Sequence, residues 1–248
     1  MLTGPGGEAL RVLAVVPARG GSKGVKRKNL AEIRGRSLVA RCGEVVGALP
    51  WLDAAILSTD DEEIAAEGRR AGLEVPFLRP AELATDTATG VAVWAHAWVE
   101  AERLHGSRYD ISVLLQPTSP FRKPEDVTRT AEALLAGDFL AATTVSRVPG
   151  HYTPQKTLLM AEDATLSFYA ADGAQHSNRQ SARACWTRNG LAYAARRETV
   201  VERGRIVEDR CAGVVIEGLV PNIDDPEDLL IARLLAEHGG YDTERPER

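Results

Sequence analysis

The chain has 248 residues and a formal net charge of −5 at pH 7; 44% of its residues are hydrophobic and 26% are charged. This composition is typical of a globular protein with a core of normal size, and it excludes a disordered chain. The acidic balance argues against general affinity for nucleic acid or for an anionic membrane, so any anion site must be local.

Apolar periodicity predicts strands that alternate with helices. The expected elements, in chain order, are a strand at 11–16, a helix at 37–48, a strand at 54–58, helices at 61–71 and 88–104, a strand at 110–116, a helix at 124–136, strands at 139–146, 190–195 and 211–218, and a last helix from Pro226. Such alternation predicts an α/β fold with a mostly parallel sheet covered on both faces. We expect one three-layer domain over residues 9–240 with a Rossmann-like, nucleotide-binding sheet, and flexible tails at 1–8 and 241–248.

Residues 147–188 interrupt this alternation. They show no clear period and contain several turn-forming residues, among them Pro149, Gly150, Pro154 and Gly173. The pattern predicts an irregular insertion that stands off the main sheet as a small lobe.

Nothing in the sequence predicts a membrane span or a secretory signal. No apolar run approaches the roughly 20 residues that a span needs, and the N-terminus has no basic segment followed by an apolar one. Three scattered cysteines, Cys42, Cys185 and Cys211, lack CxxC spacing, which suits thiols in a reducing compartment. We therefore expect a cytoplasmic protein without a nucleic-acid or membrane partner.

A basic, glycine-rich loop follows the first strand. The sequence PARGGSKGVKRKN at 17–29 contains five cationic side chains: Arg19, Lys23, Lys26, Arg27 and Lys28. Ligands of parallel α/β sheets bind at the carboxyl ends of the strands, where glycines let backbone N–H groups approach an oxyanion. The loop matches neither the P-loop nor the GxGxxG fingerprint. A polyphosphate site is the functional interpretation, and a solvated basic turn is the alternative.

The same loop resembles the nucleotide-binding signature of the acylneuraminate cytidylyltransferases. That signature is close to ARxxSKGxxxKN, and the matching residues are Arg19, Ser22, Lys23, Gly24, Lys28 and Asn29. Further family-like strings follow in order: STDDEEIA at 58–65, RPAELATDTAT at 79–89, LLQPTSPFR at 114–122, RQ at 179–180, NG at 189–190 and IDDPEDL at 223–229. The resemblance spans residues 12–236. It implies an enzyme that transfers CMP from CTP to the anomeric hydroxyl of a 2-keto-3-deoxy sugar acid and releases pyrophosphate.

The resemblance also implies roles for individual residues. Nucleotide-binding roles fall on Arg19, Gly20, Ser22, Lys23, Lys28, Asn29, Arg79 and Asp86, and catalytic roles on Arg19, Lys28 and Asp224. Sugar-binding roles fall on Gln116, Lys156, Arg179 and Asn189. Two of these have structural alternatives: Asp86 as the cap of the helix near residue 88, and Gln116 as a turn residue.

A metal site is expected near the C-terminal end. Nucleoside triphosphates bind Mg²⁺, which prefers carboxylate oxygens and water. The family commonly has Asp-x-Asp here, whereas this chain has Asn222 and Asp224, which alternation along an extended segment places on one face. Asp224 is therefore the main predicted Mg²⁺ ligand, and Asn222 offers only a neutral oxygen. One or two metal ions remain open.

The resemblance implies a homodimer in which the lobe at 147–188 reaches the partner subunit. Whether the lobe residues act in the site of their own subunit or of the partner stays open. Two alternative functions stay open at this point. One is nucleotidyl transfer to a different acceptor, such as a phosphonate or a sugar phosphate. The other is a weakly catalytic protein that binds sugar nucleotides, which Asn222 suggests.

Overall fold

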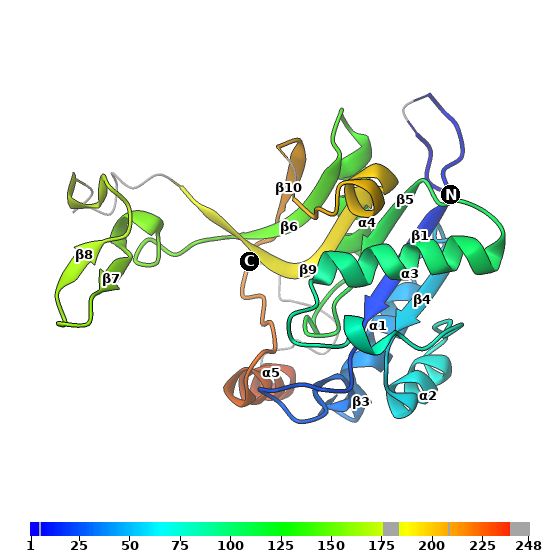
Figure 1. The fold of residues 1–248 in the computed structure, drawn as a ribbon, viewed down its shortest axis with the longest axis horizontal. Helices are drawn as coiled ribbons and strands as arrows, with labels where there is room; N and C mark the ends of the chain where they lie inside the picture. Colours follow the sequence, from blue (N-terminus) through cyan, green and yellow to red (C-terminus); the bar gives the residue numbers. More distant parts are fainter. Residues whose placement is uncertain (5, 176–183, 208, 239–248) are drawn as a thin grey trace.

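The structure is a computed structural model that describes residues 1–4, 6–175, 184–207 and 209–238. Its centre is a six-stranded sheet in the order β10-β6-β9-β5-β1-β4 (Figure 1). The strands are β1 (Val12–Pro17), β4 (Ala54–Ser58), β5 (Ile111–Leu114), β6 (Ala141–Arg147), β9 (Trp186–Arg196) and β10 (Cys211–Val215). The pairs β1–β4, β1–β5 and β10–β6 are parallel, and β9 is antiparallel to both of its neighbours. The predicted mostly parallel α/β sheet is thus confirmed.

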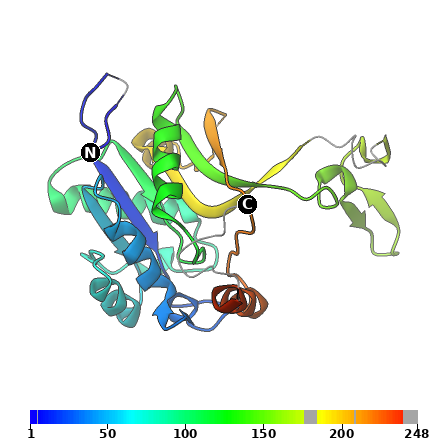
Figure 2. The same ribbon diagram turned by 180° about the vertical axis from the view of Figure 1, so that it is seen from behind.

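Helices cover both faces of this sheet and make three layers. The α-helices of the described residues are α1 (Leu38–Gly47), α2 (Glu62–Arg70), α3 (Gly90–His105), α4 (Pro124–Leu135) and α5 (Pro226–His238). Helix α3 lies over one face in Figure 1, and Figure 2 shows α1 and α4 over the other. Each α-helix begins within two residues of its predicted start, because capping residues and apolar periodicity are local signals.

The two largest hydrophobic clusters of the core lie on opposite faces of the sheet. Strand β1 supplies both, since Val12, Ala14 and Val16 face α1 and α4 while Leu13 and Val15 face α3. Alternating side chains of a strand buried on both faces must all be apolar, which explains the uninterrupted apolar run at its start.

The two tryptophans of α3 serve to pack this helix on the sheet. Trp94 and Trp98 are both fully buried in the cluster beneath α3, and the Trp94 Nε1 donates to Ser112 Oγ at 2.8 Å. They anchor the helix whose N-terminus borders the cavity described below.

Side chains at the helix starts decide one of the alternatives left open by the sequence. Thr89 is the N-cap of α3, where its hydroxyl accepts from the Ala92 N–H at 3.2 Å. Asp86 therefore does not cap this helix, and that interpretation was wrong. The cap signal lies in a threonine directly before the helix, and the carboxylate three residues earlier remains available for other contacts.

The segment expected to be irregular contains more regular structure than its pattern predicts. Strands β6 and β9 continue as a two-stranded arm as far as the pair Arg147–Trp186. Beyond the arm lie β7 (Leu158–Met160) and β8 (Leu166–Phe168), which form an antiparallel hairpin, and short helices at 154–156 and 173–175. Figure 1 shows this lobe projecting far from the sheet.

The remaining short elements are the 3-10 helices η1 (Lys28–Leu30) and η2 (Ala81–Leu83), the π-helix η5 (Glu198–Glu202) and the small hairpin of β2 (Glu32–Ile33) and β3 (Arg36–Ser37). Helix η1 closes the basic loop. Within the described part of the chain, no helix has the length and apolarity that crossing a membrane requires.

Candidate active site

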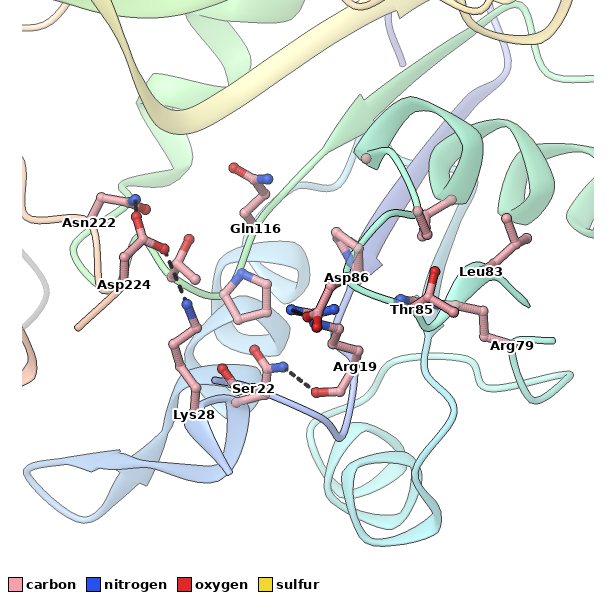
Figure 3. A pocket seen from close by; sticks show the side chains of 17 residues that line it. Arg19, Ser22, Lys28, Arg79, Leu83, Thr85, Asp86, Gln116, Asn222 and Asp224 are labelled. Carbon is pink, nitrogen blue, oxygen red and sulfur yellow. Dashed lines mark hydrogen bonds and ion pairs between the residues drawn. The ribbon is translucent and has the colours of Figure 1, made fainter. Parts of the chain in front are cut away.

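A cavity of about 400 Å³ opens at the carboxyl ends of β1 and β5 (Figure 3). Predicted site residues line much of it: Arg19, Ser22, Lys28, Asn29, Arg79, Asp86, Gln116, Asn222 and Asp224. Parallel α/β sheets bind ligands at this edge. The fold thus brings together residues more than 200 positions apart in the chain.

The other predicted residues lie elsewhere. Gly20 and Lys23 belong to the basic loop beside the cavity. Lys156 lies on a short helix of the lobe and Asn189 in β9, and neither side chain lines the cavity. Arg179 lies outside the described residues.

Two side chains hold the backbone of the basic loop in place. Asn29 Nδ2 donates to the Arg19 carbonyl at 2.9 Å, and Asp60 Oδ1 accepts from the Gly20 N–H at 3.0 Å. Gly24 packs so closely on the Asp224 carbonyl that a Cβ there would lie 2.2 Å from that oxygen. The loop therefore requires glycine at this point, and this contact ties the loop to the segment before α5.

Asp86 bridges two cations of this loop. Its carboxylate oxygens lie 2.8 Å from Arg19 Nη2 and 2.7 Å from Lys23 Nζ. The Lys23 hydrogen bond, with help from Arg19, holds the pKa of Asp86 below its usual value. The two cations thus already bind an anionic group, so a second anion at this end of the cavity would have to compete with Asp86 for them.

Arg79 is a buried residue that lines the cavity at the same end as Asp86. It is 6% exposed, and its guanidinium donates to Ser58 Oγ at 3.0 Å and to the Ser58 carbonyl. Burial lowers the pKa of Arg79 to about 10; Asp60 opposes this shift and Arg19 adds to it. Arg79 remains charged at neutral pH and adds positive potential beneath Arg19.

Lys28 and Asp224 meet at the other side of the cavity. Lys28 Nζ donates to the Ile223 carbonyl at 2.9 Å and to Asp224 Oδ1 at 3.2 Å, and Asn222 Nδ2 donates to Asp224 Oδ2 at 2.8 Å. Asp228, in the first turn of α5, accepts from the backbone N–H groups of Asp224 and Asp225 at 2.9 and 3.0 Å. The start of the helix therefore fixes the backbone that carries the Asp224 carboxylate.

Gln116 and Asn222 line the cavity, and Gly190 lies directly behind them. Gly190 is buried with φ +78°, and a Cβ at this position would lie 3.0 Å from Ser119 Oγ, 3.4 Å from Asn222 Oδ1 and 3.5 Å from Gln116 Oε1. Any side chain here would enter the space between these groups. The Asn-Gly pair in the sequence predicts a positive φ at this point. It does not show which of the two residues lies next to Gln116 and Asn222.

Asn189 points the other way, which corrects its predicted position. Its side chain accepts from Thr144 Oγ1 at 2.5 Å and donates to Ser146 Oγ at 3.0 Å, and it is 8% exposed. Asn189 therefore joins β9 to β6, while its neighbour Gly190 lies next to Gln116 and Asn222.

Comparison with known proteins assigns the family. The sequence model described as cytidylyltransferase matches residues 13–183 of this chain. The chain belongs to the cytidylyltransferase family. It is 38% identical over 125 residues to CMP-N,N'-diacetyllegionaminic acid synthase of Legionella pneumophila, covering 50% of this chain and 53% of that protein. It is 27% identical over 230 residues to a pseudaminic acid cytidylyltransferase of Campylobacter jejuni, covering 91% and 96%.

A solved structure shares the fold of this cytidylyltransferase. The CTP complex of CMP:2-keto-3-deoxy-manno-octonic acid synthetase aligns with a TM-score of 0.68 at 19% sequence identity, over 92% of this chain and 99% of that chain. The predicted family and the predicted nucleotide-binding α/β fold are both confirmed.

The cytidylyltransferase site provides an incomplete set of metal ligands. Among the described residues, no group of three or more His, Cys, Asp or Glu side chains is arranged to hold a metal ion. Asp224 offers one carboxylate, and Asn222 lies within hydrogen-bonding distance of it. Because Mg²⁺ commonly binds through one or two carboxylates plus substrate phosphates and water, these residues fit an ion that arrives with a triphosphate.

Replacing Asp86 with asparagine is expected to tighten pyrophosphate binding by about three- to tenfold, because a neutral amide competes less well for Arg19 and Lys23. Isothermal titration calorimetry with inorganic pyrophosphate measures this effect without contributions from ribose or base. Glu82→Gln, a charge-neutralising change at an exposed position on the same segment, is the control. Weaker binding by Asp86→Asn would show that Asp86 supports the phosphate site instead of competing for it.

Proposed function

We propose that the protein transfers CMP from CTP to the anomeric hydroxyl of a 2-keto-3-deoxy sugar acid of the sialic acid class and releases pyrophosphate. The observation that carries the proposal is the meeting of Arg19, Lys28, Gln116 and Asp224 in one cavity. Family membership supports CTP as the nucleotide. The names of the legionaminic acid and pseudaminic acid relatives support a nine-carbon sugar acid as the acceptor class.

The reaction divides between the two sides of the cavity. The anomeric oxygen attacks the α-phosphorus, the bond from that phosphorus to the bridging oxygen breaks, pyrophosphate leaves, and the hydroxyl proton passes to a base or to water. Arg19 and Lys23 supply positive charge for the triphosphate at one side, where they now hold Asp86. Lys28 supplies it at the other side, next to Asp224. Preorganised charge of this kind carries much of the rate in phosphoryl transfer.

Magnesium is part of this proposal. Bound between the triphosphate and the protein, it would neutralise phosphate charge and orient the α-phosphate. Asp224 would hold it, and the Asn222 side chain would offer its carbonyl oxygen after rotating its amide. Lys28 Nζ lies beside the Asp224 carboxylate and would supply positive charge to a phosphate oxygen of the bound triphosphate.

The direct test is pyrophosphate release from CTP and Mg²⁺ in the presence of single acceptors. The panel is N-acetylneuraminic acid, N,N'-diacetyllegionaminic acid, pseudaminic acid and 3-deoxy-manno-octulosonate, with ATP, GTP and UTP as nucleotide controls. Release with CTP and one or more of these acids supports the proposal. Tight CTP binding without release from any acid would overturn it in favour of a nucleotide-binding protein or a chemically different acceptor.

We also propose a homodimer formed through the lobe. Most of the large apolar side chains of the β7–β8 hairpin and its surroundings are exposed: Tyr152, Leu158, Leu159, Met160, Leu166, Phe168 and Tyr169. A concentration of apolar side chains on a projecting element is typical of a surface that another protein covers. A second copy of the chain would bury it and would bring Lys156 next to a neighbouring subunit. The cysteine thiols support the proposed cytoplasmic location.

The double substitution Leu159→Glu with Met160→Glu is expected to convert the dimer to a monomer, because it places two charges where the interface would be apolar. Light scattering coupled to size exclusion measures the mass. Leu104→Glu is the control, since Leu104 is also an exposed apolar residue but belongs to α3. A monomeric wild-type protein, or a double variant that remains dimeric, would refute the role of the lobe.

A further inference from the structure

Arg122 is a buried arginine next to Gln116, on the side of the cavity where the acceptor would bind (the acceptor side). It is 4% exposed, and it follows the segment that carries Gln116. Its guanidinium donates to three acceptors on three different parts of the fold. Nη2 donates to the Gln116 carbonyl at 2.5 Å, Nε to the Leu191 carbonyl, and Nη1 to Cys42 Sγ at 3.2 Å.

None of these partners is a carboxylate. Among the described residues, the hydrogen-bond partners of Arg122 are two backbone carbonyls and one thiol. Burial raises the pKa of Cys42, against the lowering effect of Arg122, which keeps the thiol neutral. Burying a charged group without a counter-charge costs stability unless its hydrogen bonds compensate. The three hydrogen bonds therefore have to offset much of the cost of burying the guanidinium, which makes their geometry informative.

The two carbonyls lie where two strands separate. Strands β5 and β9 pair in an antiparallel register that ends with Leu114 opposite Tyr193. Extended by two residues, the same register places Gln116 opposite Leu191. No ladder bond continues there, because the chain after β5 turns aside to border the cavity. The planar guanidinium supplies donors to both carbonyls and thereby replaces the missing ladder.

Both carbonyls belong to the acceptor side of the site. Gln116 lines the cavity, and Leu191 directly follows Gly190, where an added Cβ would lie within 3.5 Å of Gln116 Oε1, Ser119 Oγ and Asn222 Oδ1. Fixing the distance between the Gln116 and Leu191 backbones therefore fixes the position of the Gln116 side chain relative to Gly190 and Asn222.

We propose that Arg122 is a positioning residue for the acceptor: it clasps the diverging ends of β5 and β9 and so holds the Gln116 segment in place at the edge of the cavity. The proposal deepens the proposed function and rests on it. Arg122 does not line the main cavity, so it acts through Gln116 and Gly190 and not by direct contact. Nucleotide binding at the basic loop is independent of it.

Arg122→Lys tests the clasp because it keeps the charge and removes the planar fork. We expect kcat/KM for the acceptor to fall by about ten- to a hundredfold, as a small displacement of a positioning group does. The dissociation constant for CTP, measured by calorimetry, should change less than twofold. Parallel losses in acceptor and CTP binding, or no loss in either, would overturn the proposal.

A double-mutant cycle with Gln116→Ala shows whether Arg122 acts through Gln116. Adding Arg122→Lys to Gln116→Ala should lower acceptor kcat/KM much less than it does in the wild type. Additive losses would mean that Arg122 acts by another route. Arg196→Lys is the matched control. Arg196 lies on β9, the strand that also carries Leu191, and its Nε donates to the Phe139 carbonyl at 2.9 Å, away from the cavity. It should leave acceptor kcat/KM unchanged.

Hydrogen exchange separates failure of the clasp from failure of the proposed function. Arg122→Lys should speed amide exchange in the segments 115–122 and 189–193 but not in β1 or β4. If the wild type turns over no sugar acid, the proposed function fails, and unchanged exchange in these segments would refute the clasp as well. Faster exchange without any change in acceptor kinetics would make Arg122 purely structural and overturn its positioning role.

Discussion

Alanine at position 28 is expected to lower kcat/KM with CTP by about a hundred- to a thousandfold, the usual loss when one preorganised donor to a developing charge is removed. The Lys28 side chain is only 15% exposed, and its Nζ is already aimed between the Ile223 carbonyl and Asp224 Oδ1. This position between the basic loop and the predicted metal ligand suits the phosphate at which substitution occurs. Steady-state kinetics with varied CTP measures the loss.

Lys26→Ala is the matched control for this experiment. Lys26 belongs to the same loop and carries the same charge, but it is exposed and does not line the cavity. Its removal should change kcat/KM by less than about threefold, as expected of a solvated surface charge. Equal losses in both variants would mean that the loop acts by its total charge and not by the placement of Lys28. Lys28→Ala should fold normally, because Asp224 is 66% exposed and their ion pair contributes little stability.

Much of the fold is predictable from local signals in the sequence. The apolar run of β1 and the capping side chain of Asp61 at α2 mark their elements directly. The antiparallel direction of β9 is not local, since an apolar run has the same pattern in either direction. The β7–β8 hairpin also escapes prediction, because its apolar side chains are exposed in the single chain and follow no core-facing period.

The candidate site was predictable in its residues but not in its orientations. The loop string identifies Arg19 and Lys28, and both line the cavity. Whether Asp86 caps a helix or pairs with cations depends on side-chain direction, which the three-dimensional packing decides. Side-chain direction also decides that Gly190, and not Asn189, lies next to Gln116 and Asn222. The burial of Arg122 is not predictable from the sequence, because charged residues are usually exposed.

The second large effect is expected at Asp224. Asp224→Asn removes the one carboxylate of the predicted metal site, and we expect kcat to fall by about a thousandfold because the charge stabilisation given by a metal ion amounts to several kcal/mol. Asp225→Asn is the control, since Asp225 is the adjacent exposed carboxylate and does not line the cavity. Equal losses in both variants would mean that the total charge of the segment matters and not the Asp224 ligand.

Metal binding can be followed without turnover, by the loss of the electron paramagnetic resonance signal of free Mn²⁺ in the presence of CTP. Asp224→Asn should weaken Mn²⁺ binding, whereas Asn222→Asp should strengthen it, because a second carboxylate would replace the amide that now donates to Asp224 Oδ2. The second variant decides the more interesting question. If it binds Mn²⁺ more tightly and also turns over faster, Asn222 limits catalysis; if it binds more tightly but turns over more slowly, the amide serves to hold Asp224 in place. Unchanged Mn²⁺ binding in both variants would mean that the metal is held by CTP alone.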